Sequence, residues 1–150
     1  MTTKILITFS FIIGTLYSQT INWAEINRKW DCIKVIEIRG KDSIDTKQFL
    51  PSSNSYSVDL NYKEEFAESH MTTVGKYKID KINKKIIFIN LVSTVTYEWA
   101  KNPQPDYVFN SGRQTLIVVR LNAEILVLLQ KGTPNTETPL DLVFFYKATK

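Results

Sequence analysis

Residues 114–130 read QTLIVVRLNAEILVLLQ, and this stretch decides the fold class. Two runs rich in Ile, Val and Leu, Gln114–Leu121 and Glu124–Gln130, flank the pair Asn122-Ala123. Runs of this composition and length are typical of β-strands, and the two residues between them predict a tight turn. Both faces of the predicted hairpin are apolar, so a shift of one residue would exchange the inward and outward sets.

The same strand signature extends through most of the chain. Alternating or continuous apolar runs with many Ile, Val, Tyr and Phe residues predict six further strands, at residues 30–39, 46–50, 56–62, 73–80, 86–99 and 140–148. Within 86–99 the odd positions, Ile87, Ile89, Leu91, Val95, Tyr97 and Trp99, stay apolar while the even ones become polar, so we expect the odd face to point inward.

Two segments depart from this pattern. Residues 21–29 predict a short helical turn with Ile26 packed inward. Residues 63–71 are ambiguous: a strand would place Glu64, Phe66, Glu68 and His70 on one face, whereas a helix would pair Glu64 with Glu68. A strand or loop is favoured there.

These elements predict an all-β fold. About eight antiparallel strands follow one another through short connections, and the sequence offers no helix to cover a sheet edge. Closing the sheet on itself removes its edges. We therefore expect a single antiparallel up-and-down barrel of about eight strands, with a short N-terminal helical turn and room for side chains or one small ligand.

The N-terminus predicts an exported protein. Residues 1–18, MTTKILITFSFIIGTLYS, combine one basic residue, a short apolar stretch and a small residue before a polar one. These are the features of a signal peptide, and the apolar stretch is short for a bilayer span. We expect cleavage after Ser18 and a mature domain at residues 19–150, periplasmic or secreted and without a stable membrane span; an uncleaved anchor is the alternative.

Composition excludes several classes of function. The net charge of +4 falls to +3 when Lys4 is removed, and no basic stripe with interleaved aromatic residues appears, so nucleic acid is not an expected partner. A single Cys cannot form an intramolecular disulfide, and a single His does not favour a His-based metal site.

Four pieces of the chain occur in an order that resembles a known family. Residues 26–30 (INRKW) lead into the first strand, followed by 75–80 (GKYKID), the hairpin 115–128 and the closing 142–147 (LVFFYK). Together they resemble the bacterial lipocalin-like domains, especially the small exported ones of Bacteroidota. The resemblance implies a lipocalin-like barrel with a cavity, no fixed ligand and usually no enzyme activity.

The resemblance also assigns a structural role. Lipocalins usually carry Gly-x-Trp at the first strand; this chain keeps Trp30, expected to plug the closed end of the barrel, but has Arg28 in place of the glycine. Lipocalins proper also carry a basic residue late in the barrel that packs over this Trp. The candidates here are Lys147 and Lys150.

No combination of residues in the sequence predicts an active site. His70 and Glu68 could offer two metal ligands, fewer than a zinc site needs. Cys32 opens an apolar strand, as a buried core Cys would. Acid–base chemistry by Glu64, Glu65 and Glu68 would require a cleft that perturbs their pKa values, and a solvated position is the simpler interpretation. We expect no enzyme activity, no cofactor and no metal.

The favoured hypothesis is a monomer that binds a small apolar or amphipathic molecule in the barrel. Aromatic residues on separate strands could line such a cavity or simply fill the core. The residues expected to line it are Tyr77, Ile89, Leu91, Tyr97, Leu116, Val118, Leu126, Leu128 and Phe144. The alternative is a filled barrel that acts as a protein-binding module of the cell envelope, an inhibitor or assembly factor, through the loop 100–112.

Overall fold

The structure, a computed structural model, describes residues 21–46, 53–66, 70–95, 107–132 and 139–150, without the side chains of 107–113. One 3₁₀-helix, η1 (Trp23–Ile26), is followed by nine strands: β1 (Lys29–Arg39), β2 (Asp42–Thr46), β3 (Ser53–Tyr56), β4 (Asn61–Phe66), β5 (Met71–Asp80), β6 (Lys85–Val95), β7 (Tyr107–Leu121), β8 (Ile125–Gln130) and β9 (Leu140–Ala148). Among the described residues no helix is long and apolar enough to cross a membrane. The predicted signal peptide lies outside them.

Eight of the nine strands close into an antiparallel barrel, which confirms the predicted fold class. Strands β3 to β9 pair in chain order, and β1 closes the ring by pairing with β9 on one edge and with β3 on the other. The remaining strand, β2, forms a hairpin with β1 and lies outside the ring. Every closed-ring pairing is antiparallel, as expected for strands joined by short connections.

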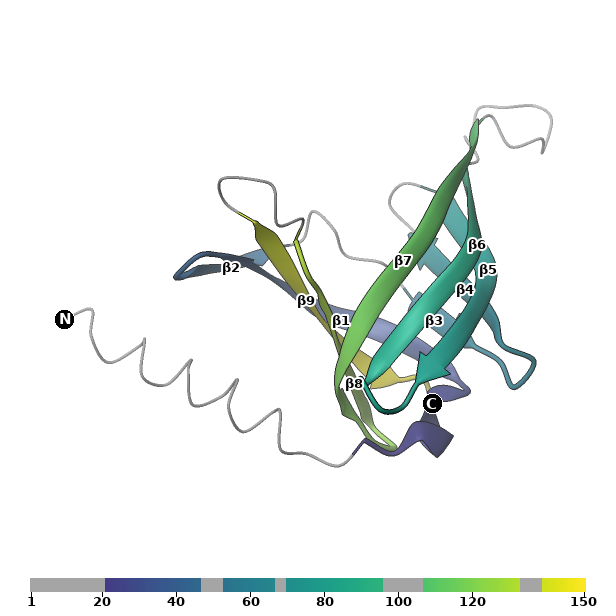
Figure 1. Ribbon diagram of the computed structural model, residues 1–150, viewed down its shortest axis with the longest axis horizontal. Helices are drawn as coiled ribbons and strands as arrows, with labels where there is room; N and C mark the ends of the chain where they lie inside the picture. The colour runs from purple at the N-terminus through teal and green to yellow at the C-terminus, as the bar shows by residue number, and fades with distance from the viewer. Residues whose placement is uncertain (1–20, 47–52, 67–69, 96–106, 133–138) are drawn as a thin grey trace.

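The seam between β1 and β3 is short, and the barrel opens beyond it. Only Lys29 to Asp31 of β1 pair with β3, whereas Val35 to Arg39 pair with β2 along the same edge. From this point β1, β2 and β9 diverge from the side formed by β3 to β7 (Figure 1). The ring is therefore tight at one end, called the floor here, and wide at the other.

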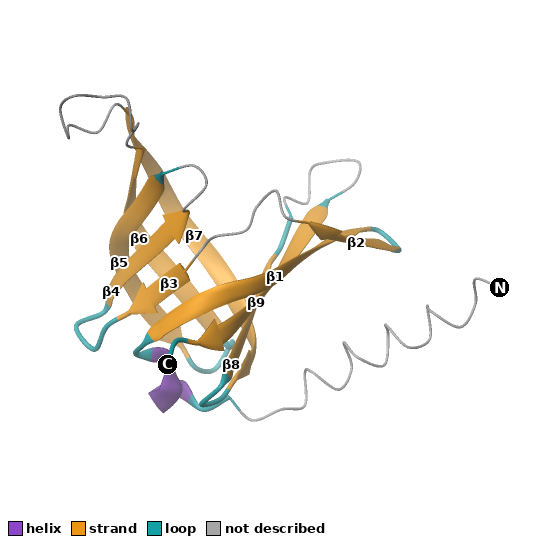
Figure 2. Cartoon of the chain, turned by 180° about the vertical axis from the view of Figure 1, so that it is seen from behind, coloured by secondary structure: helices purple, strands orange, loops and turns teal. Residues whose placement is uncertain are grey.

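η1 and the start of β1 close the floor. Figure 2 shows η1 beside the C-terminus at the tight end of the barrel. Ile26 and Trp30 are fully buried there, and Trp30 Nε1 donates a hydrogen bond to the Ile26 carbonyl oxygen at 3.2 Å. The backbone amide of Asn22 bonds Leu121 O at the end of β7. The predicted helical turn with inward Ile26 is thereby confirmed.

A β-bulge in β6 makes the predicted inward face of this strand wrong in its first half. Ile86 and Phe88 are buried, whereas Ile87 and Ile89 are only partly buried. Asn90 has φ of 54°, and the register with β7 shifts between Phe88 and Leu91. A bulge inserts one extra residue and so reverses the alternation, which returns Leu91 to the inner face.

Glycine at position 75 is required by this bulge. An added Cβ there would lie 2.8 Å from a Leu91 methyl carbon and 3.1 Å from the carbonyl oxygens of both Ile89 and Asn90. The same bulge shifts the pairing of β5 with β6 between Val74 and Lys76, and the two strands approach each other closely at Gly75.

Two predicted boundaries are also wrong. The run 56–62 is not one strand: it spans the end of β3, a turn and the start of β4, because Leu60 adopts φ of 59° and its amide bonds Ser57 O. Of the predicted strand 46–50, Thr46 is the last residue of β2 and the rest lies outside the described residues. The predicted loop 100–112 belongs to β7 from Tyr107 onward, and its earlier part lies outside the described residues.

Candidate functional site

Strand β4 places a carboxyl group inside the barrel. Tyr62, Glu64 and Phe66 share its inner face, because alternate side chains of a strand point the same way. Glu64 is paired in register with Asn54 of β3 and Thr73 of β5, both of which are buried. Glu64 is therefore the centre of an inward-facing row and not part of a solvated face.

A pocket of about 270 Å³ lies against this row, between β4 and the strands β7, β8 and β9. Its wall is mainly apolar with a few polar groups, as is usual for small-molecule sites, and its volume is slightly below their usual range. Gln114 Nε2 donates to Gln130 Oε1 across β7 and β8 at 3.2 Å. The lining residues are Tyr62, Glu64, Phe66, Gln114, Leu116, Gln130, Leu142, Phe144 and Tyr146.

Among the described residues that line this pocket, Glu64 alone is acidic. Burial raises the pKa of Glu64 to about 7, while the hydrogen bond from the Tyr62 hydroxyl acts in the opposite direction. No cationic side chain among the described residues forms an ion pair with Glu64. Close to neutral pH the pocket therefore contains a carboxyl group that gains or loses its proton easily.

A layer of buried polar side chains lies next to Glu64. Asn54 Nδ2 donates to the Tyr146 hydroxyl oxygen at 3.1 Å. Asn54 Oδ1 and the neighbouring Tyr56 hydroxyl have no partner in hydrogen-bond geometry. Burial raises the pKa values of Tyr56, Tyr62 and Tyr146, and the nearby carboxyl group of Glu64 adds to the effect. All three hydroxyls therefore remain protonated and can act as donors.

Below this layer an aromatic cluster fills the barrel. The rings of Tyr62 and Phe88 lie 4.4 Å apart between centroids, and Tyr56 lies 5.2 Å from Tyr62 and 5.3 Å from Tyr77. The Tyr77 hydroxyl is 2.8 Å from both Asn27 Oδ1 and Ser57 O, which are part of the floor. These aromatic residues fill the lower half of the barrel, so the pocket is confined to the upper half.

Trp30 lies at the floor, and the basic side chain over it is Arg28. The guanidinium carbon of Arg28 is 5.6 Å from the centroid of the Trp30 ring, a cation–π arrangement. The same guanidinium bonds Ala123 O at 3.0 Å and forms an ion pair with Glu25. Arg28 thus lies over Trp30, whereas the two lysines predicted as candidates for this position, Lys147 and Lys150, are both exposed.

Of the residues predicted to line a cavity, Leu116 and Phe144 do so. Tyr77, Leu91, Val118, Leu126 and Leu128 belong to the buried core without lining this pocket. Ile89 is displaced from the inner face by the β6 bulge, and Tyr97 lies outside the described residues.

Sequence reasoning missed the polar part of the pocket. One signal was present: a strand over 63–71 puts Glu64 and Phe66 on one face. A second is that Gln114 and Gln130 lie at even positions of the hairpin, in phase with Leu116 and Leu128. Only closure of the barrel brings these side chains together, because β4 lies across the ring from β8.

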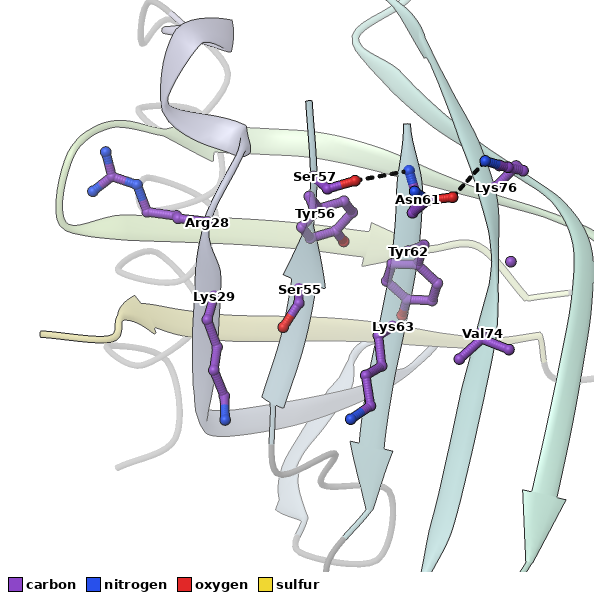
Figure 3. A pocket seen from close by; sticks show the side chains of 11 residues that line it. Arg28, Lys29, Ser55, Tyr56, Ser57, Asn61, Tyr62, Lys63, Val74 and Lys76 are labelled. Atoms are coloured by element: carbon purple, nitrogen blue, oxygen red, sulfur yellow. Dashed lines mark hydrogen bonds between the residues drawn. The ribbon is translucent and has the colours of Figure 1, made fainter. Parts of the chain in front are cut away.

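A second hollow, of about 690 Å³, lies on the outer surface of β1, β3, β4 and β5 (Figure 3). Its cations are Arg28, Lys29, Lys63 and Lys76. Lys29 and Lys63 both pair with Glu65, at 3.6 and 2.7 Å. Since this hollow is open to solvent and its charges are largely paired, the inner pocket is the better candidate for a binding site.

The outer face of β7, β8 and β9 carries a second apolar cluster. Val119, Val127 and Leu129 are buried, and four further side chains pack against them: Ile117, Ile125, Val143 and Phe145. This cluster explains why the sequence of the hairpin is apolar on both faces.

Among the remaining sequence candidates, Glu68 lies outside the described residues, and the others form no site. Cys32 is half-buried, and burial raises the pKa of its thiol to about 12, opposite to what a nucleophile needs. His70 is exposed. The described residues contain no group of three or more His, Cys, Asp or Glu side chains able to hold a metal ion.

Comparison with protein-family models, with curated proteins and with solved structures yields no match.

Proposed function

We propose that this chain is a lipocalin-like barrel that binds a small amphipathic molecule in the pocket between β4 and β7–β9. The observation that carries the proposal is the pocket itself: Leu116, Leu142 and Phe144 supply an apolar wall, and the half-buried Glu64 supplies a polar group opposite it. Binding would rest on removal of apolar surface from water, at about 25 cal/mol per Å². Orientation would come from the polar groups.

The wide end of the barrel supports this proposal. The second half of β1 pairs with β2 and not with β3, so β1 and β3 are hydrogen-bonded only at the floor end of the barrel. A ligand can therefore enter without unfolding a strand. The aromatic cluster below the pocket restricts the ligand to a small one.

A variant that fills the pocket tests the proposal. Leu116→Trp should abolish binding of a small aromatic probe, 2-phenylethanol, because the indole occupies the ligand volume. Thr115→Trp is the matched control, since Thr115 is the exposed neighbour on the same strand. Binding is measured by calorimetry, and circular dichroism confirms that both variants fold. Equal binding by both variants would refute the assignment of the pocket.

Native mass spectrometry of the protein isolated from its cells gives an independent test. A small adduct that is lost on denaturation is expected in the wild type and not in Leu116→Trp. The intact mass also reports two further parts of the proposal: removal of residues 1–18 on export, and a monomer.

One observation favours the second candidate function, a protein-binding module of the cell envelope. The outer face of β7–β9 carries a cluster of apolar side chains separate from the barrel core, with Val119, Val127 and Leu129 buried in it and Phe145 among the partly buried members. This second function makes two predictions. The Phe145→Ser variant should fail to capture a protein partner that the wild type captures. The wild type itself should not bind the small aromatic probe in its barrel.

A further inference from the structure

Among the described residues, no cationic side chain balances the charge of Glu64. The described side chains that face Glu64 come from its own strand and from β1, β3, β5 and β9. They are Tyr62, Asn54, Tyr56, Thr73, Tyr146 and Cys32. All are hydroxyl, amide or thiol groups, and the Thr73 hydroxyl is already bonded to Ser93 Oγ at 2.8 Å. Within the described part of the chain, an ionised Glu64 therefore has hydrogen-bond donors near it but no opposite charge.

The surroundings of Glu64 are suited to a cation. Tyr62 and Tyr146 border the pocket beside the carboxylate, and the faces of aromatic rings attract cations. Asn54 Oδ1, an acceptor without a partner, lies in the adjacent layer. An ammonium group carries three donors and no acceptor. A carboxylate ligand would be repelled by ionised Glu64, and a neutral alcohol would leave its charge uncompensated.

We propose that the pocket takes a small organic amine in its protonated form, with the ammonium group on Glu64 and the apolar body against Leu116, Leu142 and Phe144. This inference rests on the proposed function, since it names the ligand class of the same pocket. The volume of about 270 Å³ corresponds to about nine water molecules, which fits a compact aryl- or alkylamine and excludes a long-chain lipid.

The proposal has a consequence for pH. An ammonium ion pairs only with the ionised form of Glu64, whose pKa is about 7. The other titratable groups that face it, Tyr56, Tyr62, Tyr146 and Cys32, have raised pKa values and keep their protons in this range. Binding should therefore strengthen about tenfold from pH 6 to pH 8, and binding below pH 7 should release protons.

Three probes of similar size separate the ligand classes: phenethylammonium, neutral 2-phenylethanol and anionic 3-phenylpropanoate. Calorimetry with the purified full chain is expected to rank them in that order at pH 8. Glu64→Gln should weaken phenethylammonium binding more than about tenfold and abolish its pH dependence, while 2-phenylethanol binding is retained. Glu65→Gln, which removes the neighbouring carboxylate on the outer face of β4, should leave all three affinities unchanged.

The outcomes separate the two proposals. If none of the probes binds, the proposed function fails together with this inference. If 2-phenylethanol binds but phenethylammonium binds no better, or Glu64→Gln leaves amine binding unchanged, the inference fails and the binding function stands. Tighter binding of 3-phenylpropanoate with decreasing pH would overturn the inference in favour of a protonated Glu64 that donates to a carboxylate ligand.

Discussion

Replacing Glu64 by Gln should make the barrel more stable at neutral and alkaline pH. The carboxyl group has a pKa of about 7 in the folded protein against 4.5 in the unfolded chain. Because the pKa is higher in the folded state, ionising this carboxyl group costs more free energy in the folded protein than in the unfolded chain. The folded state is therefore destabilised most at a pH where the group is ionised in both states. At pH 8 the difference corresponds to about 3 kcal/mol of folding free energy. Gln retains the shape of Glu64 and a hydrogen-bonding group for Tyr62 but has no charge to bury.

The dependence on pH distinguishes this effect from a change in packing. Below about pH 4.5 both states hold the proton, so wild type and Glu64→Gln should unfold at nearly the same temperature. The difference in unfolding temperature between Glu64→Gln and wild type should increase between pH 4.5 and pH 7. Above pH 7 it should level off at about 10 °C for a domain of this size. Thermal unfolding followed by circular dichroism from pH 4 to pH 8.5 measures it.

Glu65→Gln is the matched control and should change stability in the opposite direction. Hydrogen bonds from Lys63 and Ser53 lower the pKa of Glu65, so its ionised form supports folding and that support is lost as the pH falls. The variant should be slightly less stable than wild type at neutral pH and should converge with it in acid. If wild type and Glu64→Gln are equally stable at pH 8, Glu64 is solvated or already paired; if their difference in stability is the same at every pH, it comes from packing and not from the buried charge.

Two further substitutions test the roles of core residues. Leu128→Ala removes a fully buried side chain beside Phe144 and should lower the free energy of unfolding in urea by about 2–5 kcal/mol. Val58→Ala, at a site 75% exposed, should leave this free energy almost unchanged. Similar losses in the two variants would contradict the assigned inner face of β8. Tyr77→Phe removes the hydroxyl that contacts Asn27 and Ser57 and should lower the free energy of unfolding by about 1–2 kcal/mol. The affinity for phenethylammonium should not change. A loss of this affinity would place Tyr77 in the proposed binding site.

The fold class was predictable because period-two and apolar runs are local signals. The hairpin 114–130 and the strands β1, β5 and β9 follow directly from such runs. The errors arose where one residue breaks the alternation. Asn90 adopts a positive φ, and the bulge there reverses the inner face of β6. Leu60 also adopts a positive φ, and it ends the alternation at a turn whose apolar residues resemble those of a strand. Apolar character alone cannot reveal a bulge, because the side chains on both sides of it remain apolar.

The candidate site was less predictable than the fold because its polar groups come from distant strands. Glu64 in isolation resembles any surface glutamate in a charged run of the sequence. What makes it unusual is the row Asn54–Glu64–Thr73, which forms only when β3, β4 and β5 pair in one particular register. The apolar wall was partly foreseen, since Leu116 and Phe144 lie in strands whose composition already indicated burial.

Two of the three buried side-chain atoms without a hydrogen-bond partner among the described residues, Asn54 Oδ1 and the Tyr56 hydroxyl, belong to the layer beside Glu64; the third, Arg120 Nε, does not line the pocket. A half-buried carboxylate without a cation and a buried amide oxygen without a donor both weaken the fold, and a hydrophobic residue at position 64 would not. Other buried polar groups are paired: Thr73 is bonded to Ser93, and Trp30 to Ile26. Departures from good packing that cluster at one cavity are typical of functional sites, where a ligand supplies the missing partner. An amine on Glu64 would supply the opposite charge, and its binding would then stabilise the folded barrel most strongly above pH 7, where the unliganded protein bears the largest penalty.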